Sequence, residues 1–286
     1  MQQKSCVYIL NENPIYHAMF SVSIRTFRKH NPNLRLRLVY VNDNNQDSWS
    51  ATNNLFKDID PYYTSRFMYF MKEDIFRLVK ELNVELTYVE ELPYKSQNFV
   101  SIQRCLFKDM DFNDVILLDV DTFCFKPIDN IFEKYQDFDF VATPLVGINF
   151  GSPEPNIVKH KMRFTYFEND IIIKENLLPY NSGVVYWKGN LLQKYGSVVL
   201  DYCNRLLYKK HPMSDMMFSL RPDARNREEV ACNLFVLENG IKSKFFDEKD
   251  VSTFDYHDDL SILHATSNGF PFIFSKLAYE QKLIPN

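Results

Sequence analysis

Short apolar runs alternate with longer stretches of helical periodicity through the first half of the chain. The strand-like runs are Cys6–Leu10, Leu36–Val41 and Val84–Val89, and the helix-like stretches are 15–30, 65–82 and 99–109. A further run, Val115–Leu118, is continuously apolar, as in a strand buried on both faces. This repeated order of strand and helix predicts an α/β fold in which helices flank a mostly parallel central sheet.

The second half of the chain is less regular. Its strand-like runs are 140–143, 183–187 and 242–246, and its helix-like stretches are 191–207 and 228–237. The long stretch 144–179 between the first two of these strands contains four prolines, and such insertions are often functional. With only 7 glycines, the chain contains neither a Walker A loop nor a GxGxxG motif.

The composition limits the partners and the compartment that can be expected for this protein. The 286 residues carry a net charge of -4 without a block of Lys and Arg, which argues against nucleic acid as a partner. The five cysteines are scattered and form no CxxC pair, which favours a reducing compartment. No signal-peptide pattern and no run of about 18 apolar residues occurs. We therefore expect a cytoplasmic protein without a transmembrane segment; the sequence leaves its oligomeric state open.

Two acids follow the apolar run at Val115–Leu118. Asp119 and Asp121 are separated by one residue, so in extended chain they point to the same side, at the end of a central strand where open α/β sheets bind ligands. Two such carboxylates indicate a site for Mg²⁺ or Mn²⁺. Solvated acids at a strand end are the plain alternative. A haloacid dehalogenase type of phosphatase is a second one, although its DxDxT pattern would need Thr or Val where Phe123 stands.

Two later segments add polar groups. Asn181-Ser182-Gly183 leads into a strand, where Gly allows close backbone approach and Asn offers a donor and an acceptor to sugar hydroxyls. His264 follows an apolar pair, and an imidazole beside two carboxylates would favour Mn²⁺ over Mg²⁺. Taken singly, the first segment is equally a loop before a strand, and the second equally a packed core histidine.

In this order, the three segments resemble the retaining glycosyltransferase family of glycogenin, galactinol synthase and bacterial lipopolysaccharide galactosyltransferases. The resemblance extends to the first strand, to the segment before the DVD motif and to a late helix and turn, with Tyr8, Ile9, Asn11, Tyr16, Arg104, Glu228, Glu229 and Gly269 at the matching positions. Two departures are clear. Glu228-Glu229 replaces Asp-Gln, and Phe270-Pro271-Phe272 replaces Lys-Pro-Trp, which leaves Lys276 as a weak substitute for the diphosphate-binding Lys.

The resemblance implies a GT-A, Rossmann-like fold in a single domain over residues 1–286. Residues 1–130 would bind the nucleotide-sugar donor, and residues 131–286 a carbohydrate or glycosylated acceptor. Asp119, Asp121 and His264 would hold Mn²⁺, with Mg²⁺ as the alternative.

The resemblance also assigns roles around that metal. The catalytic side chains would be Asn181, Glu228 and Glu229, and the donor, preferably a UDP-sugar, would contact Tyr8, Ile9, Asn11, Tyr16, Arg104, Asp119, Val120, Asp121, Ser182, Gly183 and Gly269. The resemblance implies that transfer retains the configuration of the anomeric carbon. Inversion, with one of the two glutamates as the base, stays open. A nucleotidyltransferase and a non-catalytic nucleotide-sugar-binding protein are the rival functions.

Overall fold

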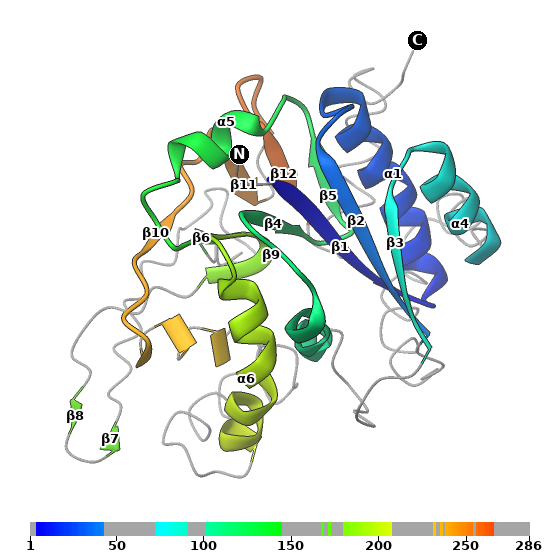
Figure 1. Ribbon diagram of the computed structural model, residues 1–286. Helices are drawn as coiled ribbons and strands as arrows, with labels where there is room; N and C mark the ends of the chain where they lie inside the picture. The colour runs from blue at the N-terminus through cyan, green and yellow to red at the C-terminus, as the bar shows by residue number, and fades with distance from the viewer. Residues whose placement is uncertain are drawn as a thin grey trace, which may run out of the picture.

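The computed structural model describes residues 4–42, 72–90, 101–144, 167–168, 171–172, 180–207, 231–232, 235–236, 238–253 and 256–265. A seven-stranded sheet in the order β10-β6-β9-β4-β1-β2-β3 forms its centre (Figure 1). The strands are β1 Ser5–Asn11, β2 Arg35–Val41, β3 Glu85–Val89, β4 Val115–Leu118, β6 Phe140–Pro144, β9 Tyr180–Trp187 and β10 Ser243–Phe245. The central position of β4 places whatever follows Leu118 in the middle of the sheet.

The sheet is mostly parallel. β1 pairs in parallel with β2 and β4, β2 with β3, and β6 with β10, whereas β9 runs antiparallel to both β4 and β6. The predicted mixed α/β architecture is confirmed. The antiparallel direction of β9 matters for the site, because it brings the start of β9 beside the end of β4.

Helices cover both faces of the sheet. On one face lie α1 (Pro14–His30), α4 (Lys72–Glu81) and α5 (Asp129–Lys134), whose apolar side chains share a core with Tyr8 of β1. On the other lie the 3-10 helix η1 (Ser101–Asp109) and α6 (Leu191–Leu207), which share a second core with Val7 and Ile9. Successive residues of a strand point to opposite faces, and β1 therefore contributes to both cores.

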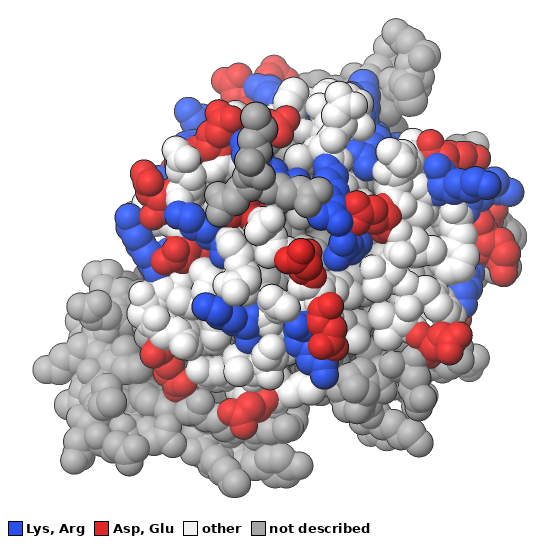
Figure 2. All heavy atoms as spheres, in the orientation of Figure 1, with Lys and Arg blue, Asp and Glu red and all other residues white. Residues whose placement is uncertain are grey.

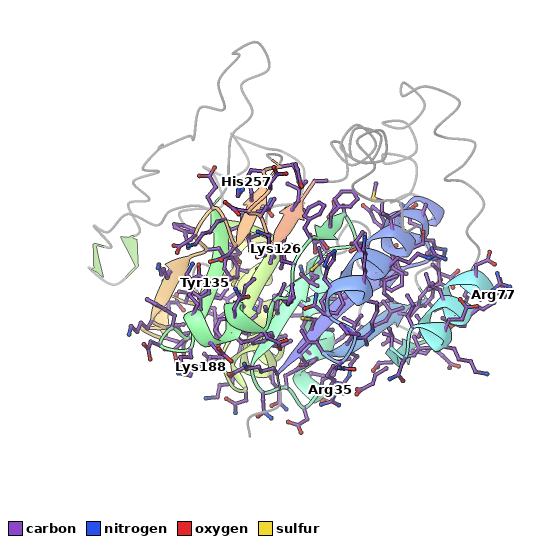
Figure 3. All side chains as sticks on the ribbon, turned by 90° about the horizontal axis from the view of Figure 1, so that it is seen from above. Arg35, Arg77, Lys126, Tyr135, Lys188 and His257 are labelled. Carbon is purple, nitrogen blue, oxygen red and sulfur yellow. The ribbon has the colours of Figure 1, made fainter. Side chains whose placement is uncertain are left out.

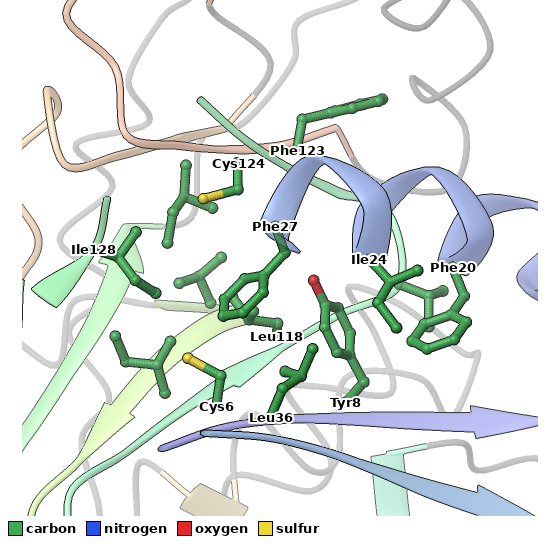
Figure 4. Close-up of a cluster of buried hydrophobic side chains, with 14 of the residues drawn as sticks. Cys6, Tyr8, Phe20, Ile24, Phe27, Leu36, Leu118, Phe123, Cys124 and Ile128 are labelled. Carbon is green, nitrogen blue, oxygen red and sulfur yellow. The ribbon is translucent and has the colours of Figure 1, made fainter. Parts of the chain in front are cut away.

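The core under α1 is rich in aromatic side chains (Figure 4). Tyr8 rises from β1 toward α1, where its ring meets the rings of Phe20 and Phe27 edge-on at centroid distances of 5.3 and 6.4 Å. Cys6 and Cys124 are buried beside them as free thiols. Edge-to-face pairs of this kind contribute roughly 0.5–1.5 kcal/mol each beyond burial, so they fix α1 firmly on the sheet.

A small second sheet packs on the same side as α1. Its order is β11 (Val251–Thr253), β12 (Ile262–His264) and β5 (Thr122–Cys124), with β12 antiparallel to β5. A two-stranded antiparallel pair, β7 (Phe167–Glu168) and β8 (Ile171–Ile172), is separate from it. The small sheet was not predicted, because three-residue strands carry too little periodicity to be recognised.

The observed elements differ from the predicted ones in a few places. The predicted helix over 99–109 is a 3-10 helix over Ser101–Asp109, and the short helix α5 was missed. The start of the helix predicted over 65–82 and much of the one over 228–237 lie outside the described residues. From above, Arg77 of α4 lies at the β3 end of the molecule and Tyr135, just after α5, at the β10 end (Figure 3).

Charged side chains of both signs are interspersed over the described part of the face shown in Figure 2. Among the described residues, no helix has the length and apolar character needed to cross a bilayer.

Candidate metal and donor site

The turn that joins β4 to β5 carries Asp119, Val120 and Asp121, and backbone hydrogen bonds hold it from two sides. The Asp119 N–H donates to the carbonyl of Gly183 at 2.8 Å, which continues the pairing of β4 with β9. The Ala265 N–H donates to the carbonyl of Asp121 at 3.0 Å, which continues the pairing of β5 with β12. Two antiparallel ladders therefore fix the directions of both aspartates.

The second ladder, between β5 and β12, also positions His264. In its register, His264 pairs with Thr122. The imidazole therefore lies beside Asp121, the residue that precedes Thr122. The Nε2 atom of His264 lies 3.1 Å from Oδ1 of Asp121, and the two side chains are only 4% and 6% exposed. The structure thus brings together the two aspartates and the histidine that were predicted from distant parts of the sequence.

These three side chains form a group suited to a cation. One ligand atom from each of Asp119, Asp121 and His264 can be chosen so that all lie within 4.8 Å of one another. Cation–oxygen distances of about 2.0–2.6 Å place opposite ligands about 4–5 Å apart, so the spacing fits a single ion. Two carboxylates and an imidazole form a mixed O/N donor set, which suits Mn²⁺ and, less well, Mg²⁺.

Asp119 is the most open member of this group, with 37% of its side chain exposed. An Arg104 guanidinium nitrogen lies 3.4 Å from its Oδ1, and that arginine side chain is only 6% exposed. Burial of the carboxyl group raises the pKa of Asp119. The positive charge of Arg104 lowers this pKa, the negative charge of Asp121 raises it further, and His264 lowers it. Two neighbouring carboxylates are costly unless a positive charge compensates them, and a bound cation would do so.

Gly183 forms one wall of the site. A Cβ atom placed on it would lie 2.2 Å from Cε1 of His264, so only glycine leaves room for the imidazole. The Gly183 N–H donates to Oδ1 of Asn181 at 2.8 Å, in the part of β9 where the register with β6 shifts. Ser182 lines a small pocket together with Arg104 and Trp187. The Asn181–Gly183 segment therefore borders the group formed by the two aspartates and the histidine, and one role of Asn181 is to hold the local backbone of β9.

A chain of buried hydroxyl groups supports the turn from below. The Tyr8 hydroxyl lies 2.8 Å from Oγ of Ser23, which lies 3.0 Å from Oγ1 of Thr122. The Thr122 hydroxyl donates to the carbonyl of Asp119 at 2.9 Å. Sequence reasoning missed Ser23 and Thr122; the one available signal was a hydroxyl residue directly after the second aspartate.

The predicted nucleotide contacts on β1 and α1 lie in different surroundings. The Tyr8 side chain is 1% exposed in the core, which argues against a direct contact with a nucleotide. Ile9 is 6% exposed in the core of the opposite face, and Tyr16 packs partly buried against the α1 core. Asn11 is 1% exposed at the end of β1, and within the described part of the chain its Nδ2 has no hydrogen-bond partner. Buried amide donors in native proteins usually have a partner, so this atom is a candidate contact for a ligand.

Four predicted residues, Glu228, Glu229, Gly269 and Lys276, lie outside the described part of the chain. Their roles stay predictions.

The sheet order, the helices on both faces and the acidic turn after the central strand define a GT-A fold, the fold of nucleotide-sugar glycosyltransferases. No protein-family model matches the chain, and no curated protein matches it in sequence. Similarity therefore rests on solved structures, which carry the argument for fold alone because their sequence identity is low.

Two of these structures are of the glycosyltransferase GlyE from Streptococcus pneumoniae TIGR4. They match with TM-scores of 0.53 and 0.51 at 12% and 13% identity, and cover 99% of this chain. This chain spans only 61% of the GlyE chains. The galactosyltransferase LgtC, solved in complex with donor and acceptor sugar analogs, is also similar, with a TM-score of 0.49, 11% identity, and coverage of 99% of this chain and 98% of that one.

Proposed function

We propose that this protein is a glycosyltransferase that moves a sugar from a nucleoside-diphosphate donor to a carbohydrate or glycosylated acceptor with the help of Mn²⁺. The observation that carries the proposal is the convergence of Asp119, Asp121 and His264 at the end of the central strand of a GT-A sheet. Solvated acids at a strand end would not require a histidine 3.1 Å from one of them with both side chains buried.

Each side chain has a distinct task in this proposal. Asp121 and His264 hold the cation from the buried side, while the more exposed Asp119 faces the side from which a diphosphate approaches. When bound, the cation neutralises the charge that develops on the departing nucleoside diphosphate. Arg104 adds a second positive charge beside Asp119, in a position to stabilise a donor phosphate or the sugar.

The nucleotide would lie along the end of β1. The Nδ2 of Asn11, which no described residue contacts by a hydrogen bond, offers a buried donor there, next to the strand that leads into the aspartate turn. UDP is the preferred nucleotide, and retention the preferred outcome, on the sequence resemblance alone. The same resemblance supports a donor-binding half over residues 1–130 and an acceptor-binding half over residues 131–286, with Asn181, Glu228 and Glu229 facing the sugar and the acceptor.

Calorimetric titration with UDP, in MnCl₂ and in EDTA, tests the donor and the metal. UDP should bind at least about 10-fold more tightly with Mn²⁺, because Asp119, Asp121 and His264 would hold the ion and its charge would offset that of the diphosphate. Asp121→Ala should abolish the difference. Asp259→Ala, which removes an acid whose side chain is 90% exposed, is the matched control and should bind as the wild type does. Equal affinity with Mn²⁺ and with EDTA would reject the proposal.

A panel of nucleotide sugars then tests turnover. Release of nucleoside diphosphate should require Mn²⁺ and the intact Asp121, and the anomeric proton of the product distinguishes retention from inversion by NMR. Binding without turnover of any donor, with or without sugar acceptors, would favour a non-catalytic binding protein. Release of pyrophosphate from a nucleoside triphosphate would favour a nucleotidyltransferase.

A further inference from the structure

Gly196 lies in the middle of α6 at the point where this helix meets η1. A Cβ atom on Gly196 would lie 2.8 Å from the backbone nitrogen of Lys108 and 2.9 Å from the carbonyl oxygen of Arg104. Both atoms belong to the backbone, so neither can rotate away as the end of a flexible side chain could. The two helices lie side by side with their backbones in contact (Figure 1).

A hydrogen bond and apolar packing hold the same contact. The Gln193 side chain donates from Nε2 to the carbonyl of Lys108 at 3.1 Å, one turn before Gly196. Phe107 of η1 is fully buried in the core that it shares with Tyr195 of α6. In a helix interior, glycine is roughly 1 kcal/mol less favourable than alanine. The local helix would therefore be more stable with alanine, and the close approach of η1 supplies a reason for glycine.

The contact fixes the residue of η1 that reaches the metal and donor site. The backbone carbonyl of Arg104 lies at the point of η1 that Gly196 touches, and the buried guanidinium of the same residue reaches to 3.4 Å from Asp119. It also lines the small pocket that contains Ser182 and Tyr195. A methyl group on Gly196 would push η1 away from α6, which would move the Arg104 backbone and, with it, the guanidinium relative to Asp119.

We propose that Gly196 is a positioning residue for Arg104: the close packing of α6 on η1 that it permits sets the distance between the guanidinium and the aspartate turn, and so the affinity for the donor diphosphate. This inference rests on the proposed function, because Arg104 matters for affinity only if a donor binds there. Gly196 itself touches neither metal nor donor.

The test is a double-mutant cycle on Gly196→Ala and Arg104→Gln, with the Kd for UDP in MnCl₂ measured by calorimetry. Gly196→Ala alone should weaken binding on the order of 10-fold, the scale of one charge-assisted hydrogen bond. In the Arg104→Gln background, it should weaken binding less than about 2-fold, since the side chain it displaces is gone. A full 10-fold loss in both backgrounds would overturn the proposal, as would no loss in the wild-type background.

Two further variants keep the test decisive. Gly240→Ala introduces strain at a φ of +58° with open space around the Cβ, so it destabilises the fold without touching η1 and should leave the UDP affinity unchanged. Gln193→Ala loosens the contact without adding an atom. It should weaken UDP binding in the same direction by a few-fold, even if Gly196→Ala fails to fold. An equal effect of Gly240→Ala, or wild-type affinity in Gln193→Ala, would contradict the proposal.

Hydrogen exchange separates failure of this inference from failure of the proposed function. If the wild type does not bind UDP with Mn²⁺, the function is rejected. Exchange of the backbone amides of 101–110 then decides the positioning claim. Faster exchange there in Gly196→Ala and in Gln193→Ala, but not in Gly240→Ala, supports it; unchanged exchange in both contact variants overturns it.

Discussion

The imidazole of His264 lies directly over the Cα atom of Gly183, so closely that a Cβ on that glycine would come within 2.2–2.4 Å of three ring atoms. Glycine at position 183 is therefore a steric requirement of the histidine. The same residue accepts the Asp119 N–H through its carbonyl. One glycine thus links the aspartate turn on one side to the histidine on the other.

Gly183→Ala should displace the His264 ring from Asp121 and weaken Mn²⁺ binding about 10- to 100-fold, the range seen when a metal ligand loses its support. Overpacking should also lower the free energy of unfolding by about 1–3 kcal/mol. Mn²⁺ titration and urea unfolding measure the two effects. The steric origin has a direct control: adding Gly183→Ala to His264→Ala should cause little further loss of stability. A full additional loss would show that the ring is not what the methyl group meets.

Replacing each aspartate by asparagine should have a different effect on stability, although both variants should lose metal affinity. Asp119→Asn removes a carboxylate whose pKa is raised by burial and by the charge of Asp121, while Asn can still accept a hydrogen bond from Arg104. In EDTA, its Tm should equal or exceed that of the wild type, yet its Mn²⁺ affinity should fall at least about 10-fold. Asp121→Asn should lower both, because it breaks the buried pair with His264. A clear loss of Tm in Asp119→Asn would contradict this assignment of charge.

The central sheet could be predicted because each strand carries its own signal. Strand β4 has the same bounds as the predicted run, Val115–Leu118. Helix α6 begins and ends at the predicted residues, Leu191 and Leu207. Periodicity reports local burial, and these elements are long or fully buried. The positions of Asp119 and Asp121 at the end of a central strand follow from the same signal together with the general rule for open α/β sheets.

The route by which His264 reaches Asp121 could not be predicted. It depends on the pairing of β12 with β5, two strands of three residues whose register is set by hydrogen bonds between segments about 140 residues apart. The sequence offered the histidine as a candidate because an imidazole beside two carboxylates makes a mixed N/O site, and the resemblance then assigned it to the metal. Likewise, Tyr8 is buried because helices cover both faces of β1, which leaves every residue of that strand buried, and the resemblance that placed Tyr8 in a nucleotide pocket does not report this packing.

The hydroxyl chain from Tyr8 to Asp119 should show a graded effect. Thr122→Val removes the donor to the Asp119 carbonyl and leaves that turn less fixed, so it should lower both stability, by roughly 1–2 kcal/mol, and Mn²⁺ affinity, by a few-fold. Tyr8→Phe removes only the far end of the chain and should cost about 1 kcal/mol of stability with Mn²⁺ affinity unchanged. A larger loss of Mn²⁺ affinity in Tyr8→Phe than in Thr122→Val would argue that Tyr8 acts in the site directly.

A second cluster of charges, between α5 and the segment that leads into β11, should govern stability in acid. Lys134 at the end of α5 pairs with both Asp247 and Asp250, and the Tyr135 hydroxyl donates to Asp250 at 2.7 Å. The hydrogen bond from Lys134 lowers the pKa of Asp247. An acid with a lowered pKa contributes stability above its ordinary pKa of about 3.9, and that contribution is lost as the pH falls through the lowered value.

Lys134→Met should therefore lower the free energy of unfolding at pH 7 by roughly 1–3 kcal/mol, mostly because the buried Asp250 loses a partner. Asp247 is the more exposed of the two acids, and the loss of its pairing should contribute less than about 1 kcal/mol to this drop in the free energy of unfolding. Urea unfolding at pH 7, 5 and 3 measures the difference between variant and wild type. It should be nearly constant from pH 7 to 5 and begin to shrink toward pH 3, as the pH approaches the lowered pKa of Asp247. Lys126→Met, which removes a pairing with the 90% exposed Asp259, should change stability little at any of these pH values. A difference that grows in acid would mean that Lys134 is held by packing of its methylene chain, and that its charge contributes little.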